Sequence, residues 1–91
     1  MKVLEREIIV ANARGVHSRV ATGLALIARE HGVLLQIVLG AERVDCSSIL
    51  DVLSMALVRG TKLTVRAEGG GAAAQSALTA AQRILTAQDE C

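Results

Sequence analysis

The sequence predicts an α+β fold in which one antiparallel sheet carries its helices on a single face. Strand-like, β-branched segments alternate with segments whose apolar residues recur at helical spacing, in the order strand, helix, two strands, helix, strand, helix. A tight turn separates the two central strands, which predicts a hairpin and therefore antiparallel pairing. The chain has 91 residues, 52% of them hydrophobic and none of them Phe, Tyr or Trp. We therefore expect one domain over residues 1–91, with a small core of aliphatic side chains.

The first half of the chain contains the predicted first strand, the first helix and the hairpin. Residues 7–10 are β-branched and half apolar, as a strand requires. Over 18–30 the apolar residues recur at helical spacing, and Gly32 suits a left-handed helix cap. Residues 33–39 are apolar and of strand length, and 40–43 turn the chain back into a second strand.

The second half begins with a predicted helix that opens at a serine. Either Ser47 or Ser48 can cap it, and Asp51 is favourably placed in its first turn. We expect this helix to run to about Val58 and to end at Gly60.

The last two elements are a strand and a helix separated by glycines. Residues 61–67 alternate as a strand, 68–71 form a flexible break, and 72–87 have helical periodicity. One apolar stripe predicts the packed face of this last helix: Ala74, Ala77, Leu78, Ala81, Ile84 and Leu85.

The segment Asn12-Ala-Arg-Gly-Val-His-Ser-Arg-Val-Ala21 joins the first strand to the first helix and carries the candidate chemistry. A helix start offers unpaired N–H groups and a partial positive charge, which favour a phosphate or another anion. Because this positive end and Arg19 disfavour imidazolium, we expect His17 to stay largely neutral near pH 7, against a usual pKa of about 6.5. A neutral imidazole is a nucleophile, and the N–H groups of Ser18 and Arg19, with the Arg19 guanidinium, could stabilise a phosphoryl group on it. From the residues alone, a surface histidine that caps a helix remains the alternative.

Composition and spacing argue against several other classes of protein. The net charge is only +1 and there is no aromatic side chain on which a base could stack, so we expect no nucleic-acid binding. Charges within the first ten residues interrupt any secretory signal, and the apolar runs are shorter than a membrane helix needs, so we expect a cytoplasmic chain. His17 and His31 are separated by roughly 20 Å of helix at 1.5 Å per residue, so they cannot bind one metal ion. Cys46 and Cys91 lack metal or redox spacing and are expected to be free thiols.

Three stretches of the chain resemble the HPr family, the histidine-containing phosphocarriers of the bacterial sugar phosphotransferase system. They are the segment 12–21, the run Val44-Asp-Cys-Ser-Ser48-Ile-Leu-Asp-Val-Leu-Ser-Met55, and Gly60 with the strand that follows it. The resemblance implies a four-stranded antiparallel sheet with three helices on one face (βαββαβα), in agreement with the elements expected above. It implies that a monomeric carrier accepts a phosphoryl group on His17 from enzyme I, ultimately from phosphoenolpyruvate, and passes it to enzyme IIA proteins. No cofactor is implied.

The resemblance also assigns roles to the start of the second helix. Ser48, which the residues alone predict as a helix cap, matches the serine that an HPr kinase/phosphorylase modifies in bacteria that have one. Ile49, Leu50 and Leu53 match an apolar surface that contacts partner proteins. Their alternative role is core packing, and we favour Leu50 and Leu53 for the partner surface because they can share a face.

The chain departs from the family pattern at its first helix and after its last strand. Most members have proline in the first turn, where this chain has Val20, which leaves the turn less preorganised. Ser18 replaces alanine or threonine, Arg14 adds a cation, and Gly70 and Gly71 replace acidic residues. A regulatory paralogue of the nitrogen-related branch, or an anion-binding domain without covalent chemistry, are the alternative functions.

Overall fold

The computed structural model describes residues 2–87, which fold into one sheet and three helices. The sheet has the strand order β1-β4-β2-β3, and all of its neighbouring strands are antiparallel. The strands are β1 (Lys2–Ile9), β2 (Leu34–Leu39), β3 (Glu42–Asp45) and β4 (Lys62–Gly69). The observed architecture is the βαββαβα fold that the sequence predicted.

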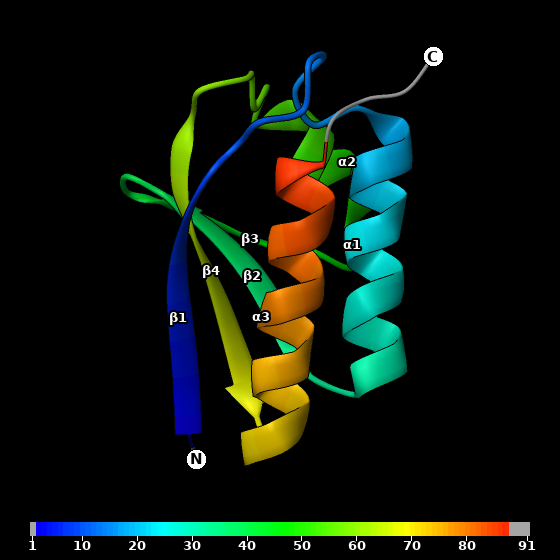
Figure 1. Cartoon of the computed structure of the whole chain (residues 1–91), viewed down its shortest axis with the longest axis vertical. Coiled ribbons are helices and arrows are strands. Elements are labelled where there is room, and N and C mark those ends of the chain that lie inside the picture. Colours follow the sequence, from blue (N-terminus) through cyan, green and yellow to red (C-terminus); the bar gives the residue numbers. More distant parts are fainter. Residues whose placement is uncertain (1, 88–91) are drawn as a thin grey trace.

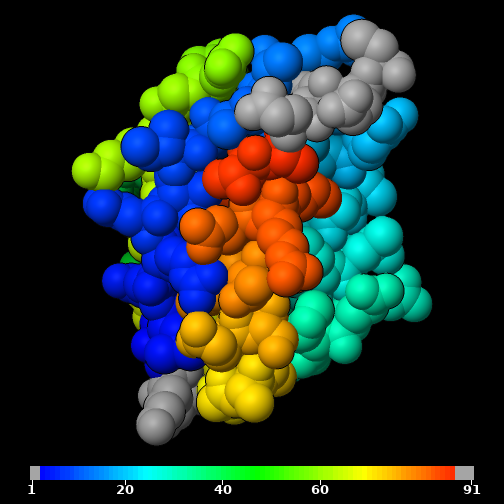
Figure 2. Space-filling model, in the orientation of Figure 1, coloured from blue at the N-terminus to red at the C-terminus, as the bar shows by residue number. Residues whose placement is uncertain are grey.

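All three helices cover one face of the sheet (Figure 1). They are α1 (Ser18–His31), α2 (Ile49–Ser54) and α3 (Gly71–Thr86). Helices α1 and α3 lie side by side and run in opposite directions, so the end of α3 lies beside the start of α1 (Figure 1). The space-filling view shows α3 packed between β1 and α1 (Figure 2). No helix among residues 2–87 is long and apolar enough to cross a membrane.

The core lies between the sheet and the helices and is built from aliphatic side chains. Strand β4 alternates as predicted: Leu63, Val65 and Ala67 are buried, while the residues between them are only half-buried. From α3 the predicted stripe is buried, except that Ile84 is half-buried and packs against the edge of the core. Helices α1 and α3 also pack close to each other. Gly23 on α1, for example, is so close to Ile84 that an added Cβ would meet the Cδ1 atom of that side chain.

Two predicted turns are confirmed. Gly32 ends α1 in the left-handed conformation, with φ 63° and ψ 35°, and its N–H is directed at the carbonyls of Ala28 and Arg29. In the hairpin Leu39 pairs with Glu42, which leaves a two-residue turn at 40–41.

The predicted end of the second helix is wrong. Helix α2 ends at Ser54 rather than near Val58, and Gly60 lies in a turn before β4. The Ser54 hydroxyl donates to the Leu50 and Asp51 carbonyls at 2.8 and 3.1 Å, so a side chain competes for the acceptors that a longer helix would use. Ala56 then takes a φ of 51°, which leaves the right-handed helical region. Beyond Ala56, the Leu57 carbonyl accepts a hydrogen bond from the Val16 N–H in the turn before α1.

Candidate phosphorylation site

The turn before α1 is bound to the loop that follows α2. The Asn12 carbonyl accepts from the Gly15 N–H at 2.9 Å, and the Val16 N–H donates to the Leu57 carbonyl at 2.8 Å. A Cβ on Gly15 would contact that same carbonyl oxygen and approach the Val58 Cα to 2.9 Å, and the φ of Gly15 is 69°. Only glycine fits both the conformation and the space. The loop after α2 therefore supports the turn that presents His17.

His17 is the N-cap of α1, and its imidazole faces the first turn of the helix. The Arg19 N–H donates to Nδ1 of His17 at 3.3 Å, and the His17 carbonyl accepts the N–H of Ala21 at 2.9 Å. The ring is half-buried. Because Nδ1 accepts a hydrogen bond, it holds a lone pair, and the neutral ring carries its proton on Nε2. The nitrogen with the lone pair is therefore the one beside the helix N–H groups.

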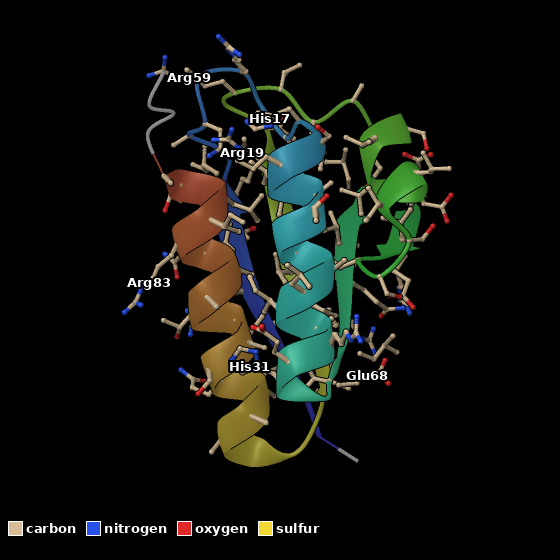
Figure 3. The ribbon with its side chains drawn as sticks, turned by 90° about the vertical axis from the view of Figure 1, so that its right-hand side faces the viewer. His17, Arg19, His31, Arg59, Glu68 and Arg83 are labelled. Atoms are coloured by element: carbon tan, nitrogen blue, oxygen red, sulfur yellow. The ribbon has the colours of Figure 1, made fainter. Side chains whose placement is uncertain are left out.

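Cationic side chains surround this end of the molecule. Arg14 lies in the turn, Arg19 in the first turn of α1, and Arg59 in the loop before β4, and all three are exposed. Figure 3 shows Arg19 and Arg59 at the same end of the helix pair as His17. Arg19 also lines a shallow groove of about 470 Å³ between α1 and α3, together with the apolar side chains of Leu26 and Ile84. An anionic group at His17 would thus lie in a positive field.

Asn12 has a structural role that the sequence did not reveal. Its side chain is 1% exposed, and its Nδ2 donates to the carbonyls of Ile84 and Ala87 at 3.0 and 2.8 Å. The Ala11 N–H donates to the Leu85 carbonyl at 3.0 Å. The last carbonyls of α3, which no helical N–H can reach, are therefore paired instead of facing the anion site. The motif showed an asparagine at this position, but not its partners, which are more than seventy residues away in the chain.

Comparisons with known proteins identify the family of this chain. The family model described as "PTS HPr component phosphorylation site" matches residues 4–87. Phosphocarrier protein NPr of Shewanella violacea is 33% identical over 88 residues, which are 97% of this chain and 94% of that protein. Phosphocarrier protein HPr of Mycoplasma capricolum is 31% identical over 64 residues, or 70% of this chain and 72% of that protein. The chain belongs to the HPr family.

The fold of HPr proteins is also the fold of this chain. A crystal structure of HPr from Bacillus anthracis matches with a TM-score of 0.83 at 22% identity, over 93% of this chain and 99% of that one. HPr-C-His from Thermoanaerobacter tengcongensis matches with a TM-score of 0.80 at 24% identity, over 93% of this chain and 91% of that chain. As a family member, the chain is a phosphocarrier rather than a stand-alone enzyme.

The serine that the HPr resemblance singled out occupies the N-cap position of α2. Ser48 is half-buried, its N–H donates to the Asp45 carbonyl at 3.0 Å, and its side chain makes no capping hydrogen bond. Ser47 instead donates from both its N–H and its Oγ to Oδ1 of Asp45, at 2.9 and 2.7 Å. Neither hydroxyl caps the helix, although Asp51 lies in its first turn as expected.

The three apolar residues expected to contact HPr partners differ in exposure. Leu50 is 78% exposed, whereas Ile49 and Leu53 are half-buried and pack against the core. Helix α2, to which Leu50 belongs, lies near the start of α1, the end of that helix at which His17 stands (Figures 1 and 3).

Of the remaining candidate residues, His31 lies away from His17 and Cys46 has a buried thiol. His31 is at the opposite end of α1 from His17, and its Nδ1 is 2.8 Å from the Ile27 carbonyl oxygen (Figure 3). Cys46 is a free, buried thiol whose pKa is raised to about 12, first by burial and then by the nearby Asp45 charge. Cys91 lies outside the described residues. Within residues 2–87 there is no group of three or more His, Cys, Asp or Glu side chains arranged to hold a metal ion.

Proposed function

We propose that Nδ1 of His17 is the phosphoryl acceptor of this HPr-family carrier. The observation that carries the proposal is the hydrogen bond from the Arg19 N–H to Nδ1, because it places the lone pair of the ring at the start of α1. In the transfer step this lone pair attacks the phosphorus of a phosphorylated donor protein. The donor's P–N bond breaks and returns its electron pair to the donor nitrogen, while the new P–N bond forms on His17. The ring keeps its Nε2 proton and takes up a positive charge, so no proton has to leave His17 for the new bond to form.

The donors around Nδ1 support this assignment. When Nδ1 becomes bonded to phosphorus, the Arg19 N–H loses its acceptor and gains a phosphoryl oxygen in its place. The Ser18 N–H lies in the same unpaired first turn, and the exposed Arg19 guanidinium adds a positive charge. His17 is half-buried and its neighbours Ser18 and Arg19 are exposed, so a partner can approach the site from their side.

We propose phosphorylated enzyme I as the donor and enzyme IIA proteins as acceptors, with this chain acting as a monomer in the cytoplasm. Transfer between two proteins requires their reacting residues to be aligned and water to be excluded from around them. The exposed Leu50 offers an apolar contact, and Arg14, Arg19 and Arg59 provide charge for an acidic partner. Ile49 and Leu53 contribute to this surface mainly by holding α2 against the core.

A regulatory carrier of the nitrogen-related branch is the second candidate function. It is favoured by the similarity to NPr of Shewanella violacea, which extends over 97% of this chain, against 70% for HPr of Mycoplasma capricolum. The two candidates share the same chemistry at His17 and differ in the enzyme I that loads the carrier.

The test is incubation of the full chain with phosphoenolpyruvate and either the sugar-branch or the nitrogen-branch enzyme I. We expect a mass increase of one phosphoryl group that is acid-labile and is absent from His17→Ala. Faster loading by one enzyme I identifies the branch. An unchanged mass with both enzymes would contradict the proposal and would favour an anion-binding domain without covalent chemistry.

We also propose Ser48 as a second, regulatory phosphorylation site. Its hydroxyl is not engaged in capping α2, and Leu50, on the expected partner surface, is only two residues away. A phosphate there would place negative charge on that surface. We expect Ser48→Asp to raise the KM of enzyme I for this carrier, and Ser47→Asp to do so less. Equal effects of the two substitutions would contradict a role specific to Ser48.

A further inference from the structure

Val20 occupies the third position of α1, within the turn where helical N–H groups have no helical acceptor. Two of its neighbours are satisfied: the Arg19 N–H by Nδ1 of His17 at 3.3 Å, and the Ala21 N–H by the His17 carbonyl at 2.9 Å. Among residues 2–87, the structure contains no acceptor for the Val20 N–H. One backbone donor beside the histidine is therefore unused.

The direction of this donor follows from helix geometry. The side chain of an N-cap residue accepts hydrogen bonds from the N–H of the second or the third helical residue, so both of these N–H groups point toward it. In α1 the cap is His17, the second residue is Arg19 and the third is Val20. The imidazole uses the second donor, and the third points to the same region.

The position of the Val20 N–H is fixed from the other side of the helix. The Val20 side chain is 4% exposed and belongs to the hydrophobic core, so the backbone at this residue is anchored. A donor that is held in place does not have to be reoriented when an anion arrives.

We propose that the Val20 N–H is a third backbone donor to the phosphoryl group on His17, beside those of Ser18 and Arg19. This inference rests on the proposal that Nδ1 of His17 is the acceptor. A proline at this position would have no N–H to offer. The carrier described here therefore holds its phosphoryl group with one more hydrogen bond than a carrier with proline, and it releases the group less readily.

The size of the effect follows from the charge of the acceptor. Hydrogen bonds to charged groups stabilise by roughly 1.5–3 kcal/mol in proteins, which corresponds to at least tenfold in an equilibrium constant. We therefore expect removal of the Val20 N–H to lower the affinity of the carrier for the phosphoryl group by about tenfold.

The experiment compares Val20→Pro with Val20→Ala. Both substitutions alter the buried side chain, but only proline removes the N–H. Each variant is mixed with the wild-type carrier, a limiting amount of phosphoryl groups and a catalytic amount of enzyme I, and the phosphorylated fractions are measured by mass at equilibrium. We expect Val20→Ala to share the group about equally with the wild type, and Val20→Pro to hold about one tenth as much.

A second readout does not depend on either variant folding. In the ¹⁵N-labelled wild type, the amide proton of Val20 should move downfield on phosphorylation together with that of Arg19. Equal partition by the proline and alanine variants, or an unmoved Val20 amide in a chain that is phosphorylated, would overturn the inference alone. A wild-type chain that enzyme I does not label would overturn the assignment of His17 as well.

Discussion

The starts of α1 and α2 each place at an N-cap a side chain that we propose to be phosphorylated, but only one of them aims it at backbone donors. At α1 the imidazole of His17 accepts the Arg19 N–H, whereas at α2 the Ser48 hydroxyl makes no capping bond. The helices that follow have 14 and 6 residues, so the first also has the larger dipole. The phosphoryl group that we propose on His17 would therefore be held by the protein's own donors, while a phosphate at α2 would act through its charge.

The two helix starts also differ in what anchors them. The turn before α1 is bound to the end of α3 by the buried Asn12 and to the loop after α2 by the Val16 N–H. The turn before α2 is held within itself by the Asp45 carboxylate, at an exposed position. The start of α1 is thus rigid because distant parts of the chain meet there. The start of α2 is set by local contacts.

The largest expected effect comes from separating the two roles of His17. His17→Ala removes both the nucleophile and the cap, whereas His17→Asn keeps a side-chain oxygen that can accept the Arg19 N–H. We expect neither variant to be labelled by enzyme I and phosphoenolpyruvate. In urea unfolding we expect the alanine variant to be less stable by about 1 kcal/mol and the asparagine variant to be close to wild type. Equal losses of stability would mean that the ring does not act as a cap.

The next largest effect is expected from removing the side chains that anchor the two helix starts, Asn12 at α1 and Asp45 at α2. Asn12→Ala empties a buried side-chain position and leaves two part-buried carbonyls at the end of α3 without their donor, so we expect the free energy of unfolding to fall by about 2 kcal/mol. Asp45→Ala removes the corresponding anchor at the start of α2, where water can replace it, and we expect a loss of less than about 1 kcal/mol. Urea titrations of both variants measure the difference. A loss for Asp45→Ala as large as that for Asn12→Ala would contradict the contrast between the two helix starts.

A pH titration examines the buried thiol that precedes Ser47. The pKa of Cys46 is raised from its ordinary value of 9.0 to about 12 in the folded chain. Above pH 9 the unfolded chain therefore loses this proton while the folded chain keeps it, and the free energy of unfolding falls as the pH rises toward 12. We expect Cys46→Ala to be less stable at neutral pH but to show a smaller decrease between pH 9 and pH 11. An identical decrease in both proteins would contradict burial of the thiol.

The parts of this structure that could be predicted from the sequence are those set by local patterns. The stripe of α3 and the left-handed cap at Gly32 follow from the spacing of neighbouring residues, and both are present. The end of α2 could not be predicted in this way, because the Leu57 carbonyl is required by the Val16 N–H, forty-one residues earlier in the chain. Contacts between residues far apart in the sequence were also what could not be predicted around His17. The sequence placed His17 at the start of a helix, but the partners of Asn12 became visible only when the chain was folded.

The smallest expected effect concerns the loop after α2, which supports the turn before α1. Ala56 has a φ of 51°, and the left-handed region costs a non-glycine residue roughly 1–2 kcal/mol. Ala56→Gly removes that cost but makes the unfolded chain more flexible, which offsets about 0.4–1 kcal/mol. We therefore expect a net gain in the free energy of unfolding of about 0.5–1 kcal/mol, measured in urea.

Ala41→Gly is the matched control for this substitution, because Ala41 is an exposed residue in the hairpin turn and has no positive φ. There the flexibility of glycine acts alone, and we expect a loss of about 0.5 kcal/mol. If Ala56→Gly is no more stable than Ala41→Gly, the left-handed conformation does not oppose folding, and the early end of α2 is caused by the Ser54 hydroxyl and the Leu57 contact alone. If it is more stable and enzyme I still labels it at the wild-type rate, the strain at Ala56 lowers stability without contributing to the position of His17.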